Sequence, residues 1–206
     1  MANPLNPTSL SMTSDANQIA HFYVRDDDTM LLSDIAILSV QARESQFGFA
    51  EFRDYPEVVT LQWPDDVLEQ WLFDHGANPS FLDDYGGLEL QDVRWDVEII
   101  DLEAFLGMPT GPSDSDYVGE IARDPDHWVG VRDEGEHVGV AQCWSAHGTW
   151  KRWPILIDRR LLIADCEGLQ IVEGRTRVGI LRGRHRQGQY VAGGHLAWVG
   201  RRLGFP

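Results

Sequence analysis

The sequence predicts an α+β fold built around a mixed β-sheet. Short apolar runs typical of buried strands alternate with an amphipathic helix and with segments whose apolar residues recur at every second position. The chain has 206 residues, of which 43% are hydrophobic, and this is enough for one large core or two small ones. Acidic and basic residues lie in different parts of the chain, so we expect an acidic N-terminal α/β region and a C-terminal unit of different character.

The charge distribution is strongly uneven along the chain. Residues 1–150 contain 29 acidic and 6 basic side chains, a formal charge of -23, whereas residues 151–206 contain 4 acidic and 11 basic side chains, a charge of +7. The whole chain therefore carries -16. Two arrangements agree with this pattern: the acidic and basic parts pack against each other, or the molecule presents two surfaces of opposite charge.

Location is predicted from three features of the sequence. No apolar run approaches the about 20 residues of a membrane-spanning helix. Met1–Ser14 lacks the basic segment and the apolar segment of a secretory signal. Cys143 and Cys166 are the only cysteines and lie far apart. We therefore expect a cytoplasmic protein without contact to a membrane, in which both thiols are reduced and buried.

The N-terminal part is predicted to begin with a flexible arm over residues 1–18, which are polar and contain two prolines. His21–Val24 and Ile35–Val40 are candidate strands, and the second also fits a short helix. Asp26–Asp28 between them is interpreted as a solvated turn, because it lacks the spaced ligands and the glycine of a calcium loop.

The acidic α/β region is predicted to span residues 19–110. Apolar residues alternate over Glu57–Trp63, which favours a half-buried strand. A helix is expected from Pro64 to the residue before Gly76, because proline suits the first helical position and glycine the residue after the last. Asp74 and His75 fall in its last turn; a functional role is open to both, but we favour the interpretation of the histidine as a helix-end cap. Residues 77–94 are expected to be loop-rich, and they lead into a strand over Val93–Ile100.

A second region is predicted over residues 117–206, after a linker candidate at Gly107–Asp116 that contains two prolines and two glycines. The sequence does not decide whether this region forms one continuous domain with residues 19–110. Trp128–Arg132 and His137–Trp144 are expected to form a hairpin. Four further strands are predicted, the last two of them as a hairpin around Gly193 and Gly194: Ile155–Ile157, Leu169–Val172, Tyr190–Ala192 and His195–Val199.

The segment Glu173–Arg177 has the composition of an anion site. Gly174 follows a predicted strand and permits a sharp turn with close approach of a ligand to the backbone. The free N–H groups at the start of the following helix, together with the helix dipole, attract anions. Arg175 and Arg177 are suited to bind a phosphate in bidentate fashion, and Thr176 to cap the helix or to donate its hydroxyl.

Glu173 and His195 complete the candidate site. Glu173 is expected to orient an arginine, to bind a metal that bridges phosphates, or to act as a catalytic base. His195 is placed either facing the phosphate site or within the core. For Arg175 and Arg177 a structural role competes with ligand binding, because the many acidic residues upstream are available as internal salt-bridge partners. A metal site formed by the protein alone is not expected, since the seven histidines and two cysteines lack zinc spacing.

Residues 150–200 resemble the ParB/sulfiredoxin-like superfamily. The similarity lies in Pro154–Asp158, which is similar to a strand of that family, and in Leu169–Gly183, which is similar to its strand, Gly-x-x-Arg turn and helix. The resemblance implies that Gly174, Arg175, Thr176 and Arg177 contact the phosphates of a nucleotide such as CTP or ATP, with Mg²⁺, and that Glu173 has a polar or catalytic role. The turn has no cysteine where the sulfiredoxins carry their catalytic one, and the chain has no residues beyond Pro206 for the helix-turn-helix that follows the ParB box.

Three functions are therefore compared. The first is a nucleotide- or phosphate-binding protein of ParB-like type that hydrolyses its nucleotide or transfers a phosphoryl group. The second is a non-enzymatic, acidic inhibitor of the immunity type, whose negative surface binds a basic toxin or nuclease. The third and weakest is a ParB-like nuclease. Direct DNA binding is not favoured, although Arg182, Arg184, His185 and Arg186 form a basic run, because the net charge of -16 repels nucleic acid.

Overall fold

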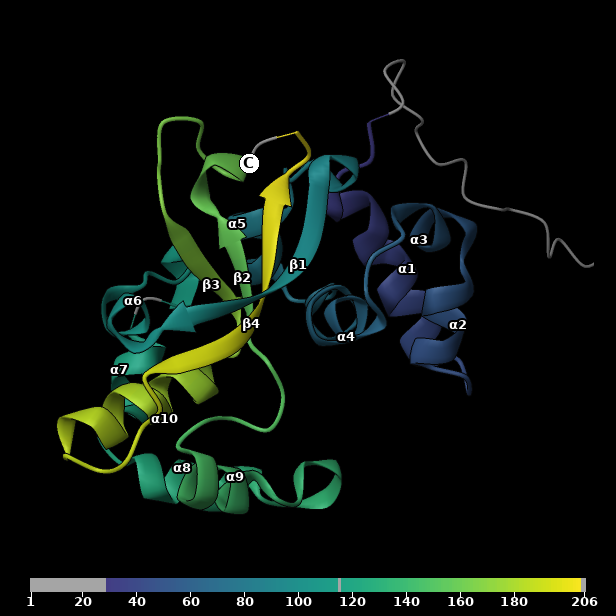
Figure 1. The fold of residues 1–206 in the computed structure, drawn as a ribbon. Helices are drawn as coiled ribbons and strands as arrows, with labels where there is room; N and C mark the ends of the chain where they lie inside the picture. Colours follow the sequence, from purple (N-terminus) through teal and green to yellow (C-terminus); the bar gives the residue numbers. More distant parts are fainter. Residues whose placement is uncertain (1–28, 115, 205–206) are drawn as a thin grey trace, which may run out of the picture.

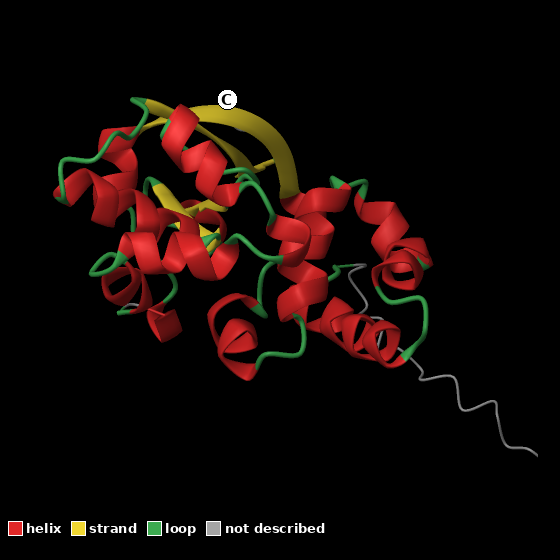
Figure 2. Cartoon of the chain, turned by 90° about the horizontal axis from the view of Figure 1, so that it is seen from below, coloured by secondary structure: helices red, strands yellow, loops and turns green. Residues whose placement is uncertain are grey.

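The computed structural model describes residues 29–114 and 116–204 of the chain. This part of the chain has an α+β fold, as predicted, with one four-stranded mixed sheet and helices on both sides of it (Figure 1). In the view turned by 90°, all strands belong to that sheet and helices make up most of the remaining chain (Figure 2). The predicted arm over residues 1–18, the strand His21–Val24 and the turn Asp26–Asp28 lie outside the described residues.

The sheet has the strand order β1-β4-β2-β3. β1 pairs antiparallel with β4, β4 pairs parallel with β2, and β2 pairs antiparallel with β3. β1 comes from the predicted region 19–110, and the other three strands come from the predicted region 117–206. Both regions therefore contribute to one sheet. The bounds of the strands are β1, Val93–Asp101; β2, Ile155–Asp158; β3, Leu169–Glu173; and β4, Gly194–Arg202.

The N-terminal helices pack against one face of the sheet. The helix predicted from Pro64 is present and continues as a π-helical segment up to Phe73, while Ile35–Val40 lies inside a helix and not in a strand. These helices bury a core of aromatic and aliphatic side chains that also includes Trp95 of β1. Their bounds are α1, Leu32–Glu44; α2, Phe49–Asp54; α3, Pro56–Leu61; α4, Asp65–Val67; η1, Leu68–Phe73; α5, Pro79–Tyr85; and η2, Leu90–Asp92.

Two predictions for this region are wrong. Glu57–Trp63 is not a strand, because Pro56 begins α3, and of its alternating residues Val59 is exposed whereas Val58 is buried. Residues 77–94 are not mainly loop, because α5 starts at Pro79. The side chain of Asn78 accepts a hydrogen bond from the Ser80 amide and caps that helix.

Most of the helices after β1 cover the opposite face of the sheet; the short helix at residues 159–161 is an exception, because Leu161 packs against the N-terminal core. The hairpin predicted over residues 128–144 is wrong, because both of its arms are helical. Pro125 occupies the first turn of α8, and the Asp124 side chain accepts a hydrogen bond from the His127 amide. The bounds are α6, Leu102–Gly107; η3, Pro112–Asp114; α7, Tyr117–Ile121; α8, Pro125–Arg132; η4, Gly135–His137; α9, Val140–His147; η5, Arg159–Leu161; and α10, Arg175–Arg186.

The strand–turn–helix unit at the C-terminus is close to the prediction. β2 and β3 begin and end within one residue of the predicted bounds, and α10 begins directly after the predicted glycine turn. The second predicted hairpin is wrong in part: His195–Val199 lies in β4, but Tyr190–Ala192 is not in a strand. The linker candidate Gly107–Asp116 contacts the sheet instead of running free of it, because Thr110 forms a β-bridge with Ile171 of β3.

The sheet separates two hydrophobic clusters, and its residues alternate between them. Ile155 and Ile157 of β2 contribute to the cluster under the N-terminal helices, whereas Leu156 contributes to the cluster under α7, α8 and α10. All three side chains are fully buried. This alternation is the period of a strand that is covered on both faces.

The uneven charge of the sequence is largely matched within the fold. Arginines of the last 56 residues bind carboxylates of the first 150, so the first of the two predicted charge arrangements describes the molecule best. Several of these pairs join distant elements: Arg152 to Asp66 and Glu69, Arg175 to Asp114, Arg184 to Asp126, Arg201 to Glu98, and Arg202 to Asp92.

Within residues 29–114 and 116–204 no helix is long and apolar enough to span a membrane. Cys143 and Cys166 are both free, as expected, but they are half-buried and not fully buried. The Sγ of Cys166 accepts a hydrogen bond of 3.7 Å from Arg159.

Candidate functional site

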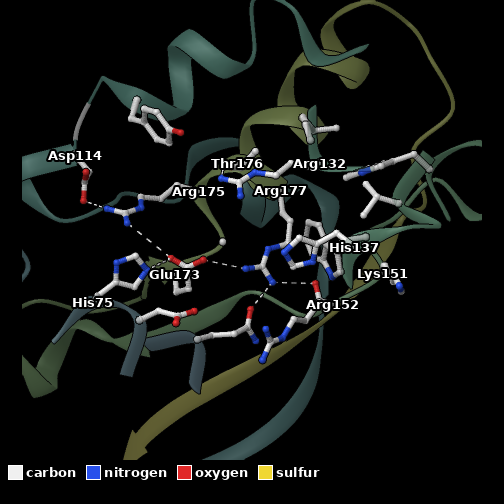
Figure 3. Close-up of a pocket in the computed structure, with 18 residues that line it drawn as sticks. His75, Asp114, Arg132, His137, Lys151, Arg152, Glu173, Arg175, Thr176 and Arg177 are labelled. Carbon is white, nitrogen blue, oxygen red and sulfur yellow. Dashed lines mark hydrogen bonds and ion pairs between the residues drawn. The ribbon is translucent and has the colours of Figure 1, made fainter. Parts of the chain in front are cut away.

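A cavity of about 720 Å³ opens at the N-terminus of α10, where β3 passes into the helix (Figure 3). This is within the range of small-molecule sites in proteins. The predicted residues Glu173, Gly174, Arg175, Thr176 and Arg177 all line it. Five cationic side chains and three carboxylates form its walls, an excess of two positive charges: Arg132, Lys151, Arg152, Arg175 and Arg177 against Asp74, Asp114 and Glu173.

Gly174 forms the turn between β3 and α10. Its φ is +96°, in the left-handed region, and a Cβ at this position would lie 2.6 Å from Cβ of Pro154. The first hydrogen bond of α10 runs from the Val178 amide to the Gly174 carbonyl, so the three amides before Val178 have no partner within the helix. No described side chain caps this end of α10. The helix therefore presents unpaired donors and the positive end of its dipole to the cavity.

Replacement of Gly174 by alanine is expected to destabilise the protein by about 3 kcal/mol. The left-handed conformation costs a residue with a Cβ about 1–2 kcal/mol, and crowding against Pro154 adds about 1–3 kcal/mol. Gly168→Ala is a matched control, since φ is +91° there but no described atom lies within 4 Å of the added Cβ. Urea unfolding should show a clearly smaller loss for Gly168→Ala; equal losses would contradict the tight contact at Gly174.

Glu173 contacts two arginines and one histidine at the floor of the cavity. Its Oε1 accepts a hydrogen bond of 3.0 Å from Arg177, and its Oε2 lies 3.0 Å from Nε2 of His75 and 3.7 Å from Arg175. Burial opposes ionisation of this carboxyl, but the hydrogen bond with His75 and the charge of Arg177 outweigh it and hold the pKa of Glu173 below its ordinary value. Glu173 is therefore ionised and held in place by its neighbours. Its contacts with Arg175 and Arg177 agree with the first of its three predicted roles, in which it orients an arginine.

The guanidinium of Arg177 is occupied by the protein itself. Its Nη1 donates to Oε1 of Gln70 at 2.7 Å and to the carbonyls of Arg152 and Trp153 at 3.1 and 2.9 Å, while its Nη2 donates to Glu173. Burial lowers the pKa of Arg177, and the charge of Glu173 counteracts this effect. Arg177 therefore ties β3, η1 and the segment before β2 together, which is the structural alternative that the sequence left open.

Arg175 is held less completely. Its side chain pairs with Asp114 of η3 and, at the longer distance, with Glu173. Burial lowers the pKa of Arg175 as well. Because one of its two ion pairs is long, this guanidinium is bound less completely by the protein than that of Arg177, which satisfies four acceptors.

The opposite wall of the cavity contributes cations that the sequence analysis did not identify. Arg132, at the end of α8, donates to the Thr176 hydroxyl at 3.3 Å. Lys151 donates to the Val138 carbonyl at 2.6 Å, and His137 lies beside it on the same wall (Figure 3). These residues lie 26 to 45 positions before Arg177 in the sequence, and no local pattern connects them with the turn.

His75 is the other residue that the sequence analysis missed. The interpretation as a helix-end cap is wrong, because its Nε2 contacts Glu173, 98 positions away. The helix around η1 is buried nearly all round, since it lies between the N-terminal core and the cavity, and its end brings His75 to the cavity floor. His75 retains 24% and Glu173 retains 17% of side-chain exposure, so both can be reached from the cavity.

The inner wall of the cavity is apolar. Trp144, Trp150 and Ile180 line it and are themselves part of the core. Four tryptophans in this part of the molecule form two pairs: Trp144 packs on Trp150 at 6.2 Å between ring centres, and Trp153 packs on Trp198 at 5.5 Å. Only the first pair borders the cavity.

His195 does not belong to the site. It is 1% exposed, does not line the cavity, and its Nδ1 lies 2.9 Å from the Thr149 hydroxyl. Burial lowers its pKa. Of the two predicted placements the core position is the observed one, because β4 turns this side chain toward Phe105 and Trp150.

The basic run at the end of α10 is also partly structural. Arg182 donates to the carbonyls of Phe105 and Met108, and Arg184 pairs with Asp126 at 3.2 Å. Both guanidinium groups are therefore bound to the protein's own acceptors, and the run does not form a continuous basic surface for nucleic acid.

No protein-family model, curated protein or solved structure matches this chain. The function is therefore inferred from the chemistry of the cavity. Among the residues that the structure describes, no group of three or more His, Cys, Asp or Glu side chains is arranged to hold a metal ion. What the cavity offers is helix amides, an excess of cations and an apolar inner wall, a combination that suits an anion attached to an apolar or aromatic group.

Proposed function

We propose that the chain is a nucleotide- or phosphate-binding protein of ParB-like type and that its ligand occupies the cavity at the N-terminus of α10. The observation that carries this proposal is the juxtaposition of uncapped helix amides with Arg132 and Lys151, which reach the same cavity from other elements. A helix N-terminus alone attracts anions weakly, but cations on the facing wall make the attraction selective.

The roles of the residues differ from those expected from the sequence. The amides of Arg175 and Thr176 and the hydroxyl of Thr176 are proposed to bind phosphate oxygens. Arg132 already contacts Thr176 and is placed to add a bidentate contact, and Lys151 supplies a second cation. Arg177 is proposed to position Glu173 and not to touch the ligand. A Mg²⁺ ion would arrive with the nucleotide phosphates.

The apolar inner wall supports a ligand with a ring. Trp144, Trp150 and Ile180 form the side of the cavity away from the solvent, where a nucleobase would exclude water. The order of strand, glycine turn and helix over Leu169–Arg186 supports the resemblance to the ParB/sulfiredoxin-like superfamily for the C-terminal unit. The two free thiols are consistent with the cytoplasmic location that we propose.

A thermal-shift screen tests the proposal. CTP, ATP, ADP, GTP and pyrophosphate are added to the full chain, each with and without Mg²⁺. A ligand at 100 times its dissociation constant adds about 2.7 kcal/mol to the stability of the folded state. For a chain of this size that corresponds to a rise in Tm of about 5–10 °C. If none of these compounds raises Tm at low salt, the proposed function is wrong.

A second candidate is the acidic inhibitor that binds a basic toxin or nuclease. It is favoured by carboxylates that stay exposed after the internal pairs are formed. They include Glu44, Asp83, Glu89, Asp101, Glu103, Asp116 and Glu120. This candidate predicts a complex with a basic protein that is held by attraction between exposed charges. Salt at 0.1 M screens exposed charges that are more than about 10 Å apart, so this complex should dissociate as the salt concentration rises.

A further inference from the structure

We infer that His75 is a general base in the cavity, that Glu173 positions it, and that the protein hydrolyses a phosphoanhydride bound at the N-terminus of α10. This inference rests on the proposed phosphate site and extends it to an activity. It is carried by the contact of 3.0 Å between Nε2 of His75 and Oε2 of Glu173, two side chains that line the same cavity (Figure 3).

The surroundings of Glu173 determine which nitrogen of His75 carries the proton. Glu173 also accepts a hydrogen bond from Arg177, and it has a lowered pKa, so it remains a carboxylate at neutral pH. A carboxylate accepts a hydrogen bond and cannot donate one. Nε2 of a neutral His75 must therefore hold the proton, and Nδ1 keeps the lone pair of a base. A carboxylate that fixes the tautomer of a histidine in this way is a recurring arrangement in hydrolytic sites.

Glu173 itself is a poor base. Arg177, Arg175 and His75 all contact its two oxygens, so protonation of this carboxylate is unfavourable. Asp74, the neighbour of His75 in the chain, and Asp114, which is paired with Arg175, are further charged groups that line the cavity. Nδ1 of His75 is therefore the proton acceptor that the geometry offers in this part of the cavity.

The proposed step is hydrolysis. The oxygen of a water molecule attacks the terminal phosphorus, and the water proton passes to Nδ1 of His75. The bond between phosphorus and the bridging oxygen breaks, and its electron pair stays on that oxygen, which is stabilised by Arg132 and Lys151. His75 then releases its proton to solvent, so one phosphoanhydride and one water give two phosphate products. The helix amides hold the transferred group in place throughout.

His75→Gln is the variant that tests the inference. The glutamine amide can donate to Glu173 as the imidazole does, but it cannot accept a proton. Phosphate release from CTP, ATP and pyrophosphate with Mg²⁺ is measured together with the ligand-induced rise in Tm. We expect the rise in Tm to be unchanged within 1 °C, whereas phosphate release falls about 100-fold or more, the usual contribution of a general base. His127→Gln, on the exposed side of α8, should behave as the parent.

The pH dependence adds a readout that a purely structural role would not change. Phosphate release by the parent should depend on pH, because a general base must be unprotonated to accept the water proton, and the residual release by His75→Gln should lack this dependence. The inference is overturned if the parent binds a probe without releasing phosphate, or if His75→Gln releases phosphate at the parent's rate. If no probe raises the Tm of the parent, it is the phosphate site itself that fails.

Discussion

Arg177→Ala is expected to lower the free energy of unfolding by about 3–5 kcal/mol, the range for removal of one partner from a buried ion pair. The side chain is 20% exposed and satisfies four acceptors. Without it, Glu173 retains a buried charge with less compensation, and the Gln70 side chain loses its donor. No cavity water can restore all of these contacts in the same geometry.

The matched control is Arg132→Ala, which removes an arginine from the same cavity. Arg132 is exposed and makes one hydrogen bond, to Thr176, so its loss should change the free energy of unfolding by about 0.5 kcal/mol or less. Urea unfolding of both variants provides the comparison. If Arg177→Ala is no more destabilising than Arg132→Ala, Arg177 does not have the structural role assigned to it.

The second large effect concerns the ligand. The double variant Arg132→Glu/Lys151→Glu is expected to weaken binding of the nucleotide that gives the largest rise in Tm by about 100-fold or more. Two attractive charges on the cavity wall become repulsive, and like charges in a binding site cost several kcal/mol. Both side chains lie at the cavity rim, so the fold should be kept. Isothermal calorimetry at low salt measures the affinity.

A second double variant separates the local effect from the field of the whole molecule. Arg53→Glu/Arg94→Glu changes the formal net charge from -16 to -20, as the first double variant does, since each replacement removes one positive and adds one negative charge. Arg53 and Arg94 have exposed side chains outside the cavity. Binding by this control should remain within a few-fold of the parent. Equal losses in both double variants would place the ligand elsewhere.

The sequence predicts the fold best where burial alone determines the structure. Ile155–Ile157 is apolar without interruption and Leu169–Val172 is interrupted by Gln170; in the structure they form the internal strand β2 and the edge strand β3, both covered on both faces. Val93–Ile100 has the alternation of a strand and forms β1. Gly174 marks the start of α10 because only glycine adopts its backbone conformation next to Pro154 without strain.

Several of the wrong assignments share a cause, although α9, the second arm of the predicted hairpin, begins at Val140 without a proline. The other three helices that the sequence predicts as strand or loop begin with proline, and the residue before it lies outside the helix. At Asn78 and Asp124 that preceding residue also caps the helix with its side chain. Proline at the first helical position together with an N-cap is a signal of helix start, and here it outweighs the strand propensity of the valines and tryptophans that follow.

The candidate site was predicted only in its contiguous part. Glu173–Arg177 could be found because the turn, the helix start and the arginines are adjacent in the sequence. His75, Arg132 and Lys151 come from three other elements, and their approach depends on how the helices pack around the sheet. The division of roles between Arg175 and Arg177 also depends on long-range contacts, since Gln70 and Asp114 decide which guanidinium is fully occupied.

The central claim, that an anion binds at the uncapped start of α10, is tested most directly by the backbone amide resonances of residues 174–177. These are followed by NMR as pyrophosphate is added to the full chain at low salt. We expect the amide signals of Arg175 and Thr176 to shift with saturation, together with that of Gly174, and the signal of Gly168, an exposed glycine with a similar positive φ, to stay unchanged. Unchanged signals over residues 174–177 at saturating pyrophosphate, or shifts confined to other parts of the chain, would contradict the claim.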